Sequence, residues 1–343
     1  NIVRVHKQDI IMVWDGSYSG HVFTGFEGAL ASTMVKIHPK TQSINALFLY
    51  YVLVKKFPIL HGTTVGTGIP HVNKMVFVNL PIQLPPLPEQ KAIAHVLLAI
   101  DEAIQKTNEI IEKVKRLKKG LMQELLTKGI GHKEFKDTEI GRIPKEWKVV
   151  RLDHITDVVD PWPSHRAPKV VEDGIPYVGI GDIDENGRIL VEQCRKVSEK
   201  VAEEQRGLFG DWDIGFGRVG TVGKVVWLRK QPFKYALSPT MAIIKPHDNV
   251  NRQYIFYALQ SSYVKKQVRL LITGSTRESL GITRLRMIKL PLPPLSEQQK
   301  IAEILSTVDK RLEVERRMKE KLERIKKAMM DLLLTGKIRV KVS

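Results

Sequence analysis

Two glycine patterns in the sequence resemble phosphate-binding loops. Residues 215–220 fit G-x-G-x-x-G, which binds a dinucleotide or S-adenosylmethionine when a strand precedes the glycines and a helix follows them. The run that follows here, 221–227, is strand-like, so these glycines predict a hairpin turn. Gly223-Lys224 does not complete a P-loop, because that pattern needs Gly in place of Arg218 and Ser or Thr in place of Val225. We therefore expect no nucleotide or S-adenosylmethionine cofactor.

Side chains that act as nucleophiles or metal ligands are not grouped in the sequence. The one cysteine, Cys194, has no nucleophile signature around it and cannot form an internal disulfide or a Cys-rich zinc site. The 10 histidines show no H-E-x-x-H spacing and no clustering with acidic residues. An Asn/Asp-Pro-Pro-aromatic run, which would carry amino-methyltransferase chemistry, is also missing. The sequence predicts no catalytic residues, no metal site and no cofactor, and hence a protein that is not an enzyme.

The charge of the chain indicates an anionic partner. Its 343 residues include 55 Lys and Arg against 37 Asp and Glu, which gives a formal net charge of +18. The surplus lies mainly outside two long helical stretches, so we expect the globular parts to bind a phosphate backbone. A Lys and Arg content that only aids solubility is the alternative.

Nothing in the sequence indicates a membrane or secreted protein. No apolar run approaches the ~18 residues that span a bilayer. The first residues lack the charged-then-apolar pattern of a signal peptide. A single cysteine suits a reducing compartment. We expect a cytoplasmic protein that has no contact with a membrane.

An internal repeat organises the chain. The run Leu-Pro-Pro-Leu-Pro-Glu-Gln at 84–90 recurs as Leu-Pro-Pro-Leu-Ser-Glu-Gln at 292–298. The same displacement continues without a gap to Leu-Leu-Thr at 125–127 and 333–335. Colinear similarity of this length indicates a tandem duplication of a globular segment followed by a long helix.

The repeat also predicts domain boundaries. The second copy begins near Gly141, whereas residue 1 already aligns with about residue 205. We therefore expect the first copy to be N-terminally incomplete and the chain to be a fragment of a longer one. The predicted segments are a first domain at 1–87, a long helix at 88–128, a linker at 129–140, a second domain at 141–296, a second long helix at 297–335 and a basic tail at 336–343.

Each copy is predicted to have an α+β fold. The run Asp-Glu-Asn-Gly at 184–187 carries the Asn-Gly hairpin signal. Helices are expected at 251–267 and, in the other copy, at 44–56. β-Branched and aromatic residues between Gly, Asp and Asn turns indicate strands at 149–152, 176–180 and 222–228.

The two long stretches carry apolar residues at alternating spacings of four and three, which is typical of a coiled-coil seam. Pro88 opens the first stretch, and Ser296 with Gln299 forms a capping box at the second. Gly129 and Gly336 stand at C-terminal positions. At 1.5 Å per residue each helix extends about 54 Å. We expect an antiparallel coiled coil that separates two pseudo-symmetric α+β domains; packing of each helix on its own domain is the alternative.

These motifs resemble a known family. The duplicated Leu-Pro-Pro-Leu-x-Glu-Gln, long helix and Leu-Leu-Thr, with Thr-Glu-Ile-Gly-Arg-Ile-Pro-Lys-Glu-Trp at 138–147, resemble the specificity (S) subunit of type I restriction–modification systems. The resemblance implies two target recognition domains, each reading half of a bipartite double-stranded DNA site. It further implies that the long helices hold these domains apart and dock methyltransferase (M) subunits, two of them, with restriction (R) subunits joining through the complex.

Polar and basic side chains exposed in turns are the candidates for contact with DNA, because Arg suits guanine and Ser or Thr suits several bases. Candidates for reading bases are Ser17, Tyr18, His21, Thr67, His71, Arg218, Thr221, Lys224, Ser275, Thr276 and Arg277. Candidates for neutralising phosphates are Lys265, Lys266 and Arg269. Candidates for contacting the M subunit, on the outward faces of the long helices at their starts, are Glu89, Gln90, Glu297 and Gln298. A solvated surface residue is the alternative for each of them, and helix capping explains the last four equally well.

Two other functions remain open at this point. A coiled-coil scaffold would bind another protein or RNA through the paired basic domains, and composition alone does not separate RNA from DNA. A methyltransferase with its own active site is disfavoured because its motifs are missing.

Overall fold

The computed structural model describes residues 3–162, 168–184, 187–206, 210–274 and 278–341. The chain forms two compact units. Unit 1 comprises Asn1–Ile111 and Glu315–Ser343, and unit 2 comprises Glu112–Val314. Each unit contains one globular domain together with part of each long helix.

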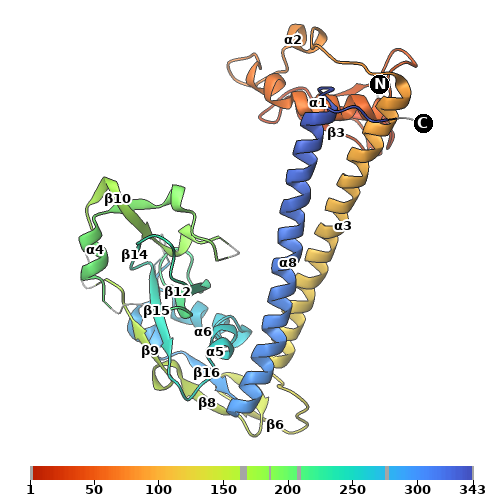
Figure 1. Cartoon of the computed structure of the whole chain (residues 1–343). Coiled ribbons are helices and arrows are strands. Elements are labelled where there is room, and N and C mark those ends of the chain that lie inside the picture. The colour runs from red at the N-terminus through yellow and green to blue at the C-terminus, as the bar shows by residue number, and fades with distance from the viewer. Residues whose placement is uncertain (1–2, 163–167, 185–186, 207–209, 275–277, 342–343) are drawn as a thin grey trace. The chain divides into compact units, whose positions relative to one another are not determined.

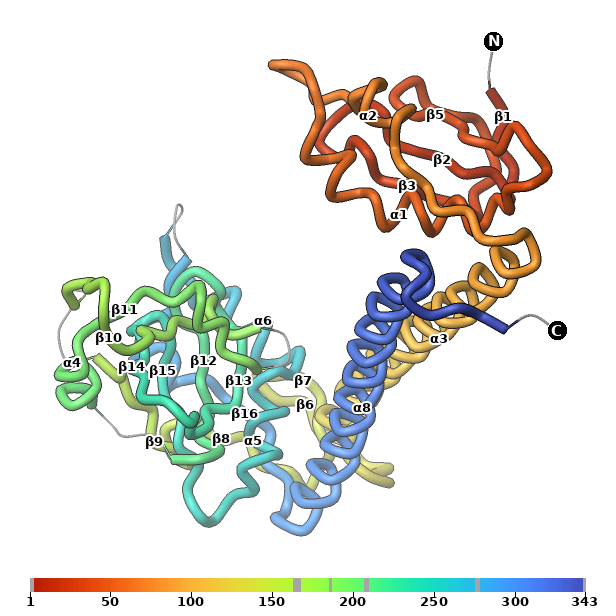
Figure 2. The backbone as a smooth tube through the Cα atoms, turned by 45° about the horizontal axis from the view of Figure 1, so that its top comes forward, coloured from red at the N-terminus to blue at the C-terminus, as the bar shows by residue number. Residues whose placement is uncertain are grey.

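Unit 1 contains a small antiparallel sheet and a helix that covers it (Figure 2). β2 is the central strand of the order β3-β2-β5, and β1 pairs separately with β4. Ile10 and Met12 of β2 lie on one face and pack against Leu49 and Leu53 of the helix α1. Its elements are β1 (Arg4–Val5), β2 (Ile10–Val13), β3 (Val22–Phe23), β4 (Gly28–Ala29), β5 (Met34–Ile37), α1 (Ala46–Gly62) and α2 (Lys74–Val78).

Unit 2 is larger and has a four-stranded antiparallel sheet of order β13-β12-β15-β9 at its centre. Smaller sheets of order β11-β10-β14, β16-β8 and β6-β7 surround it. Its strands are β6 (Phe135–Thr138), β7 (Gly141–Pro144), β8 (Lys148–Arg151), β9 (Thr156–Val159), β10 (Val170–Val178), β11 (Arg195–Val197), β12 (Asp213–Gly217), β13 (Val225–Leu228), β14 (Ala236–Leu237), β15 (Met241–Pro246) and β16 (Lys289–Leu292). Its helices are α4 (Glu199–Glu204), α5 (Arg252–Ala258), α6 (Ser262–Leu271), α7 (Ile282–Arg286) and the single 3-10 turns η1 (Leu152–His154), η2 (Ile180–Asp182) and η3 (Val191–Gln193).

The two long helices, α3 (Leu87–Leu125) and α8 (Leu295–Leu333), each contain 39 residues. In unit 1 their segments run antiparallel, since Asp101 of α3 pairs with Lys326 of α8 and Glu89 pairs with Arg339 beyond α8. The unit 2 segments also run antiparallel, with Lys118 of α3 paired to Asp309 of α8. Figures 1 and 2 show the segments side by side in both units.

Each long helix also packs on the domain that precedes it. Ile93, Ala94 and Leu97 of α3 share a core with Phe48 and Tyr51 of α1. The equivalent residues of α8, namely Ile301, Ala302 and Leu305, share a core with the α5 helix of unit 2. The α+β class and the antiparallel pairing of two long helices are confirmed, and the helices contact their own domains as well as each other.

Two local predictions are wrong. The single helix predicted at 251–267 is two helices, α5 and α6. The chain leaves the helical conformation between them, and Ser261 caps the start of α6 by accepting a hydrogen bond from Val264 N. Ser296 is not an N-cap, since α8 already begins at Leu295. The segment predicted as a linker, 129–140, contains β6, which pairs with β7.

Other local predictions are confirmed. The hairpin interpretation of the glycine pattern holds, because β12 is followed by its antiparallel partner β13 and not by a helix. Gly129 and Gly336, with φ of 68° and 69°, take the left-handed conformation that favours glycine after a helix. Of the predicted Asn-Gly turn, residues 185–186 lie outside the described residues.

The described residues contain neither a membrane span nor a metal-binding cluster. Among them, no helix is both long and apolar enough to cross a bilayer. Within the same residues, no group of three or more His, Cys, Asp or Glu side chains is placed to hold a metal ion. Cys194 is half-buried, and burial raises the pKa of its thiol to about 11.

Candidate nucleic-acid interface

The hairpin between β12 and β13 forms the first loop of unit 2. Gly217 N donates to Lys224 O at 2.7 Å and Gly223 N donates to Gly217 O at 2.9 Å, which closes the turn. Gly220 and Gly223 have φ of 78° and 85°, so the tight turn needs glycine at both positions. Thr221 lies exposed at the tip of this loop, as expected for a residue that contacts DNA.

A second loop of unit 2, between α6 and α7, is joined to the first by backbone contacts. Val219 forms a β-bridge with Ser279, and Ser279 forms another with Thr273. Gly220 N donates to Glu278 O at 3.1 Å, and Leu280 N donates to Arg218 O at 2.8 Å. The two loops that the sequence singled out therefore form one surface feature. Three candidates at the tip of the second loop lie outside the described residues: Ser275, Thr276 and Arg277.

Arg218 does not have the exposure expected of a base-reading side chain. Its side chain is only 12% exposed, and its Nη1 lies 3.2 Å from Asp160 Oδ2. Burial lowers the pKa of Arg218, and the carboxylate of Asp160 partly offsets this effect. The expectation of an exposed Arg218 is wrong because its guanidinium is used to join the first loop to the end of β9.

Lys224 is also engaged inside the protein. Its Nζ donates to the backbone carbonyl of Ile183, and the side chain is partly buried. A lysine whose ammonium is held by a carbonyl oxygen is less available to a base than a free one. Of the three candidates on the first loop, Thr221 alone is exposed.

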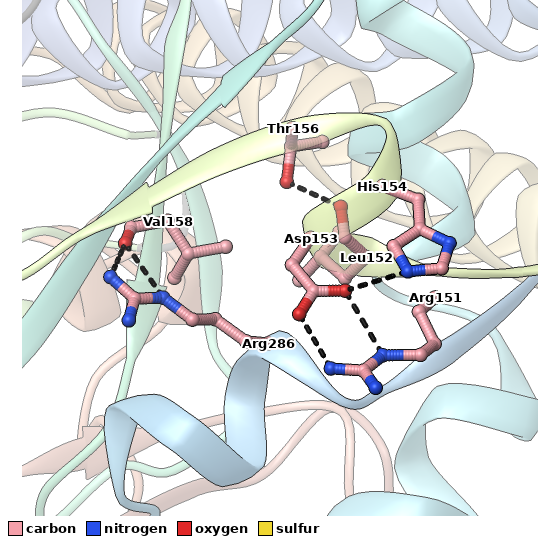
Figure 3. Close-up of polar contacts among 7 residues, drawn as sticks. All are labelled: Arg151, Leu152, Asp153, His154, Thr156, Val158 and Arg286. Atoms are coloured by element: carbon pink, nitrogen blue, oxygen red, sulfur yellow. Dashed lines mark hydrogen bonds and ion pairs between the residues drawn. The ribbon is translucent and has the colours of Figure 1, made fainter.

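Figure 3 shows the contacts that hold the start of β9 and the helix α7. Arg286 of α7 donates from Nη2 to Val158 O at 2.8 Å and from Nε to the same oxygen at 3.3 Å. Arg151 and Asp153 form a two-bond ion pair beside this contact, with N–O distances of 2.6 and 3.1 Å. Arg286 thus joins α7, which follows the second loop, to β9, while Asp160 at the end of β9 pairs with Arg218 of the first loop.

The three phosphate candidates of α6 are all exposed. Lys265, Lys266 and Arg269 face solvent, whereas Val264 and Val268 on the other side of the helix are buried in the core. This amphipathic pattern places three positive charges together on one exposed side. The geometry suits contacts with a phosphate backbone, which need exposed cations and no particular base.

Unit 1 has an equivalent pair of loops. Asp15, next to the β2–β3 turn, forms a β-bridge with His71, and His71 forms another with Val65. His71 Nδ1 also lies 2.6 Å from Asp15 Oδ1, so this side chain has a partner within the protein. The exposed candidates of unit 1 at these loops are Ser17, Tyr18, Thr67 and His71.

His21 lies at the base of the first loop of unit 1 and is partly buried. Its ring centroid is 4.1 Å from that of Phe57 and 5.7 Å from that of Tyr18. Burial, and secondarily the neighbouring His61, lowers the pKa of His21. The imidazole therefore favours the neutral form, which both donates and accepts one hydrogen bond.

Comparison with known proteins decides the family. The profile of the type I restriction modification DNA specificity domain matches residues 1–116 and 144–324. The chain belongs to this family. It is 38% identical to the type I restriction enzyme MjaVIII specificity subunit of Methanocaldococcus jannaschii, over 99% of this chain and 81% of that protein. The putative type I restriction enzyme MjaX specificity subunit of the same organism is 35% identical, over 90% of this chain and 72% of that protein.

Solved structures agree with this assignment at the level of the fold. The S subunit of a type I restriction–modification system from M. genitalium matches 99% of this chain and 84% of that chain, with a TM-score of 0.60 at 16% identity. A chain from a structure on complex assembly of the type I system matches 96% and 82%, with a TM-score of 0.54 at 18% identity. The predicted membership in the specificity subunit family, and with it a non-catalytic chain, is confirmed.

The four residues predicted to contact an M subunit have hydrogen-bond partners within this chain. Gln90 is buried, accepts from Asn45 N at 2.9 Å and donates to Ser43 O at 3.0 Å. Gln298 repeats this role, accepting from Asn251 N at 2.8 Å and donating to Pro293 O at 2.8 Å. Both glutamines thus tie the start of a long helix to the N-cap of a domain helix.

The two glutamates are anchors of the same kind. Glu89 accepts from Arg339 Nε at 2.7 Å and from Arg339 Nη2 at 2.5 Å. Glu297 accepts from Ile130 N and from Trp147 Nε1, both at 2.9 Å, and lies beside His132 Nε2. The predicted outward orientation is wrong for all four residues, because the carboxylates and amides are satisfied by segments distant in the sequence.

The sequence-based reasoning missed the residues that hold the loops in place. Asp160, the partner of Arg218, and Arg286, which binds Val158 O, carry no recognisable motif. The contacts of Glu297 could have been suspected from the sequence, since Glu-Gln ends the Leu-Pro-Pro-Leu-x-Glu-Gln run in both copies of the repeat. A polar pair repeated with its surroundings indicates a structural contact made twice.

Proposed function

We propose that this chain is the DNA-recognition subunit of a type I restriction–modification complex. It binds double-stranded DNA and brings M and R subunits to the target, and it catalyses no reaction itself. The M. jannaschii relatives support this role, since they are type I restriction enzyme specificity subunits. The net charge of +18 supplies attraction for DNA phosphates. This role places the chain in the cytoplasm, in the compartment that holds the DNA.

The observation that carries the proposal is the loop pair found in each unit. In unit 1, His71 bridges both Asp15 and Val65, and in unit 2 Ser279 bridges both Val219 and Thr273. Equivalent positions of the repeat therefore bring two loops with exposed polar side chains together twice. Two similar readers on one chain are what a bipartite target requires, so we assign one half-site to each unit.

Within each loop pair, base readout is assigned to exposed tips and phosphate contact to α6. Thr221 of unit 2 and Ser17, Tyr18 and Thr67 of unit 1 are exposed and can reach the edges of bases. Lys265, Lys266 and Arg269 are exposed on one side of α6 and carry charge without sequence information. Arg218 and Lys224 support the first loop of unit 2 from inside.

The M subunits need a surface other than the buried Glu-Gln pairs. Leu117 of α3 in unit 2 and Ile325 of α8 in unit 1 occupy equivalent positions of the repeat. Their side chains are 54% and 40% exposed, so each long helix presents an apolar side chain to solvent. Because the repeat places this exposed side chain once in each unit, it suits two copies of the same partner, and we assign one M subunit to each.

The test determines which DNA positions the reconstituted complex methylates. The full chain is combined with its M subunit, and methylated positions are mapped by sequencing across random DNA. We expect two short conserved sequences separated by a spacer of fixed length. In a variant in which residues 65–71 are replaced by those of a relative, one half of the target changes and the other stays.

Three outcomes contradict the proposal. Methylation at a single continuous sequence would remove the assignment of one half-site to each unit. A change in both halves after replacement of residues 65–71 would do the same. Binding of single-stranded RNA or of protein in preference to duplex DNA, measured by gel shift, would favour the scaffold function instead.

A further inference from the structure

The side chain of Trp147 in unit 2 lies in a buried site, called here its seat, formed by Glu297, Gly129 and the end of α3. The side chain is fully buried, and its Nε1 donates to Glu297 Oε2 at 2.9 Å. Its ring lies directly over Gly129, since a Cβ added to this glycine would be 2.7 Å from Trp147 Cζ2. The core around it includes Leu125 and Leu126 at the end of α3. The seat therefore consists of a carboxylate, a glycine and an apolar helix end.

The internal repeat provides the same seat in unit 1. Glu89 is the counterpart of Glu297. Gly336 is the glycine that follows the end of α8 as Gly129 follows the end of α3, although it stands one position earlier in the repeat. Leu333 and Leu334 at the end of α8 correspond to Leu125 and Leu126. Gly336 has a φ of 69°, close to the 68° of Gly129, so the backbone at the two glycines has the same conformation.

In unit 1 this seat is an open cavity. Its volume is about 290 Å³, and Phe48, Leu84, Glu89, Leu333, Leu334 and Gly336 are among the residues that line it. A Cβ added at Gly336 would meet no atom within 4 Å, in contrast to Gly129. Leu84 at its rim is 52% exposed. Over residues 3–111 and 315–341 the one tryptophan is Trp14, which packs against Phe77 and not in the cavity.

Glu89 carries a substitute donor in this state. The guanidinium of Arg339 binds both carboxylate oxygens of Glu89, and Val340 N donates to Oε1 at 3.3 Å. Glu297 instead receives a backbone donor, Ile130 N, and the indole N–H of Trp147. The Arg339 side chain is 66% exposed, so it can move aside without breaking a packed core. The buried carboxylate of Glu89 is then available to another N–H donor.

We infer that the cavity of unit 1 is a docking site for an Ile-Pro-x-x-Trp segment, the motif formed by Ile143 and Pro144 with Trp147 in unit 2. The indole lies on Gly336 between Leu84 and the end of α8, and its N–H donates to Glu89. Trp147 itself cannot be the occupant, because it is fully buried in its own seat. The inference does not depend on the DNA-binding role proposed above.

Docking has a clear physical basis. An indole buries a large apolar surface, and its single N–H needs an acceptor when it leaves water. The cavity offers both, with Phe48 and two leucines as apolar contacts and Glu89 as the acceptor. The same combination of apolar contacts and a carboxylate already holds a tryptophan in unit 2, where Glu297 accepts from the indole N–H.

The experiment measures binding of a fluorescein-labelled peptide with the sequence of residues 138–150 to the full chain by fluorescence anisotropy. We expect saturable binding, weakened at least tenfold by Trp147→Ala in the peptide. Peptide and protein are both positively charged, so Coulomb attraction does not produce this binding. No saturable binding, or equal binding of the Trp147→Ala peptide, would overturn the inference.

A substitution in the protein locates the site. Gly336→Asn keeps a residue that tolerates a positive φ and fills the space above the glycine, so we expect at least a tenfold loss of peptide affinity. Gly131→Asn is the matched control, because Gly131 has a φ of 73° with no atom near an added Cβ and does not line the cavity. Its affinity should equal that of the unmodified chain, and circular dichroism should show unchanged helix content in both variants.

Occupation by a second copy of this chain is distinguished by light scattering. A chain that dimerises, separates into monomers on Gly336→Asn and fails to bind the peptide would overturn the inference in favour of self-association. Peptide affinity that is unchanged by Gly336→Asn would overturn it by placing the binding elsewhere. Since the Trp147→Ala peptide needs no protein variant, the inference is tested even if Gly336→Asn does not fold.

Discussion

Lys118 on α3 lies 2.5 Å from Asp309 on α8, measured from Nζ to Oδ1. The same carboxylate accepts a hydrogen bond from the hydroxyl of Tyr257 on α5 at 2.8 Å. In unit 2 one aspartate therefore joins both long helices to the globular domain. The repeat forms the same triad in unit 1 from Lys326, Asp101 and Tyr51, with a Lys–Asp distance of 2.6 Å and a Tyr–Asp distance of 2.9 Å.

The triad of unit 2 makes a testable contribution to stability. Lys118→Met removes a partly buried cation from Asp309, so the free energy of unfolding should fall by about 1–2 kcal/mol. Lys115→Met is the matched control, since Lys115 pairs with Glu112 on the same helix and both side chains are well exposed. That change should stay within about 0.5 kcal/mol in urea unfolding. Equal effects of the two substitutions would show that the triad does not hold the helices.

The ion pair between Arg218 and Asp160 predicts a structural role for a residue first considered as a base reader. Arg218→Ala leaves Asp160 without its guanidinium and loosens the first loop of unit 2, at a cost of about 1.5–3 kcal/mol. Urea unfolding of the full chain measures this loss, and mapping of methylated sites measures specificity. A stable variant that tolerates one changed base pair would instead assign base readout to Arg218.

The pKa of His21 predicts a pH dependence of unit 1. Burial against Phe57 and the neighbouring His61 lowers this pKa below the ordinary value of 6.5. Well above pH 6.5 the imidazole is neutral in both folded and unfolded chains, and the stability contribution is complete. As the pH falls from 6.5 through the lower pKa of the folded state, the unfolded chain binds more protons and stability decreases.

An NMR titration of the histidine ring measures this effect. His21 should titrate with a midpoint below 6.5, and Phe57→Ala should move the midpoint back toward 6.5 by admitting water. His21→Phe should remove the corresponding part of the stability loss in thermal unfolding between pH 6.5 and 5. A midpoint at or above 6.5 in the unmodified chain would contradict the buried, neutral imidazole.

The sequence predicted those features of the fold that depend on repetition and periodicity. Colinear copies of Leu-Pro-Pro-Leu-x-Glu-Gln indicated the duplication, and four-three spacing indicated helices that the structure extends over Leu87–Leu125 and Leu295–Leu333. Both signals are local in the chain or compare the chain with itself.

Contacts between distant segments could not be predicted in the same way. Glu297 is polar and begins a helix, so it was expected outside, yet its carboxylate binds Trp147, which lies 150 positions earlier in the chain. Arg218 was expected at an exposed tip, but Asp160 captures its guanidinium. In both cases burial of a charged group is stable only because a specific partner arrives from elsewhere in the fold.

The basic side of α6 predicts binding that depends on salt and not on sequence. Changing Lys265, Lys266 and Arg269 together to Gln removes three exposed charges, so the slope of log affinity against log salt should fall by about 0.9 for each phosphate that is no longer neutralised. Affinity should weaken by a similar factor for target and non-target duplexes. Lys119→Gln, an exposed lysine on α3, serves as the control and should leave the slope unchanged. Weakening confined to the target duplex would assign these residues to base readout.

The exposed apolar positions on the long helices predict the number of M subunits that bind. Leu117→Asp places a charge where unit 2 is assigned one M subunit, and Ile325→Asp does the same for unit 1. Because both side chains face solvent in the free chain, the substitutions should change its thermal unfolding little. Light scattering of the complex should show two M subunits with the unmodified chain, one with either variant and none with the double variant. Two bound M subunits in the double variant would move the contact to another surface, whereas loss of both in one single variant would show that the two sites are coupled.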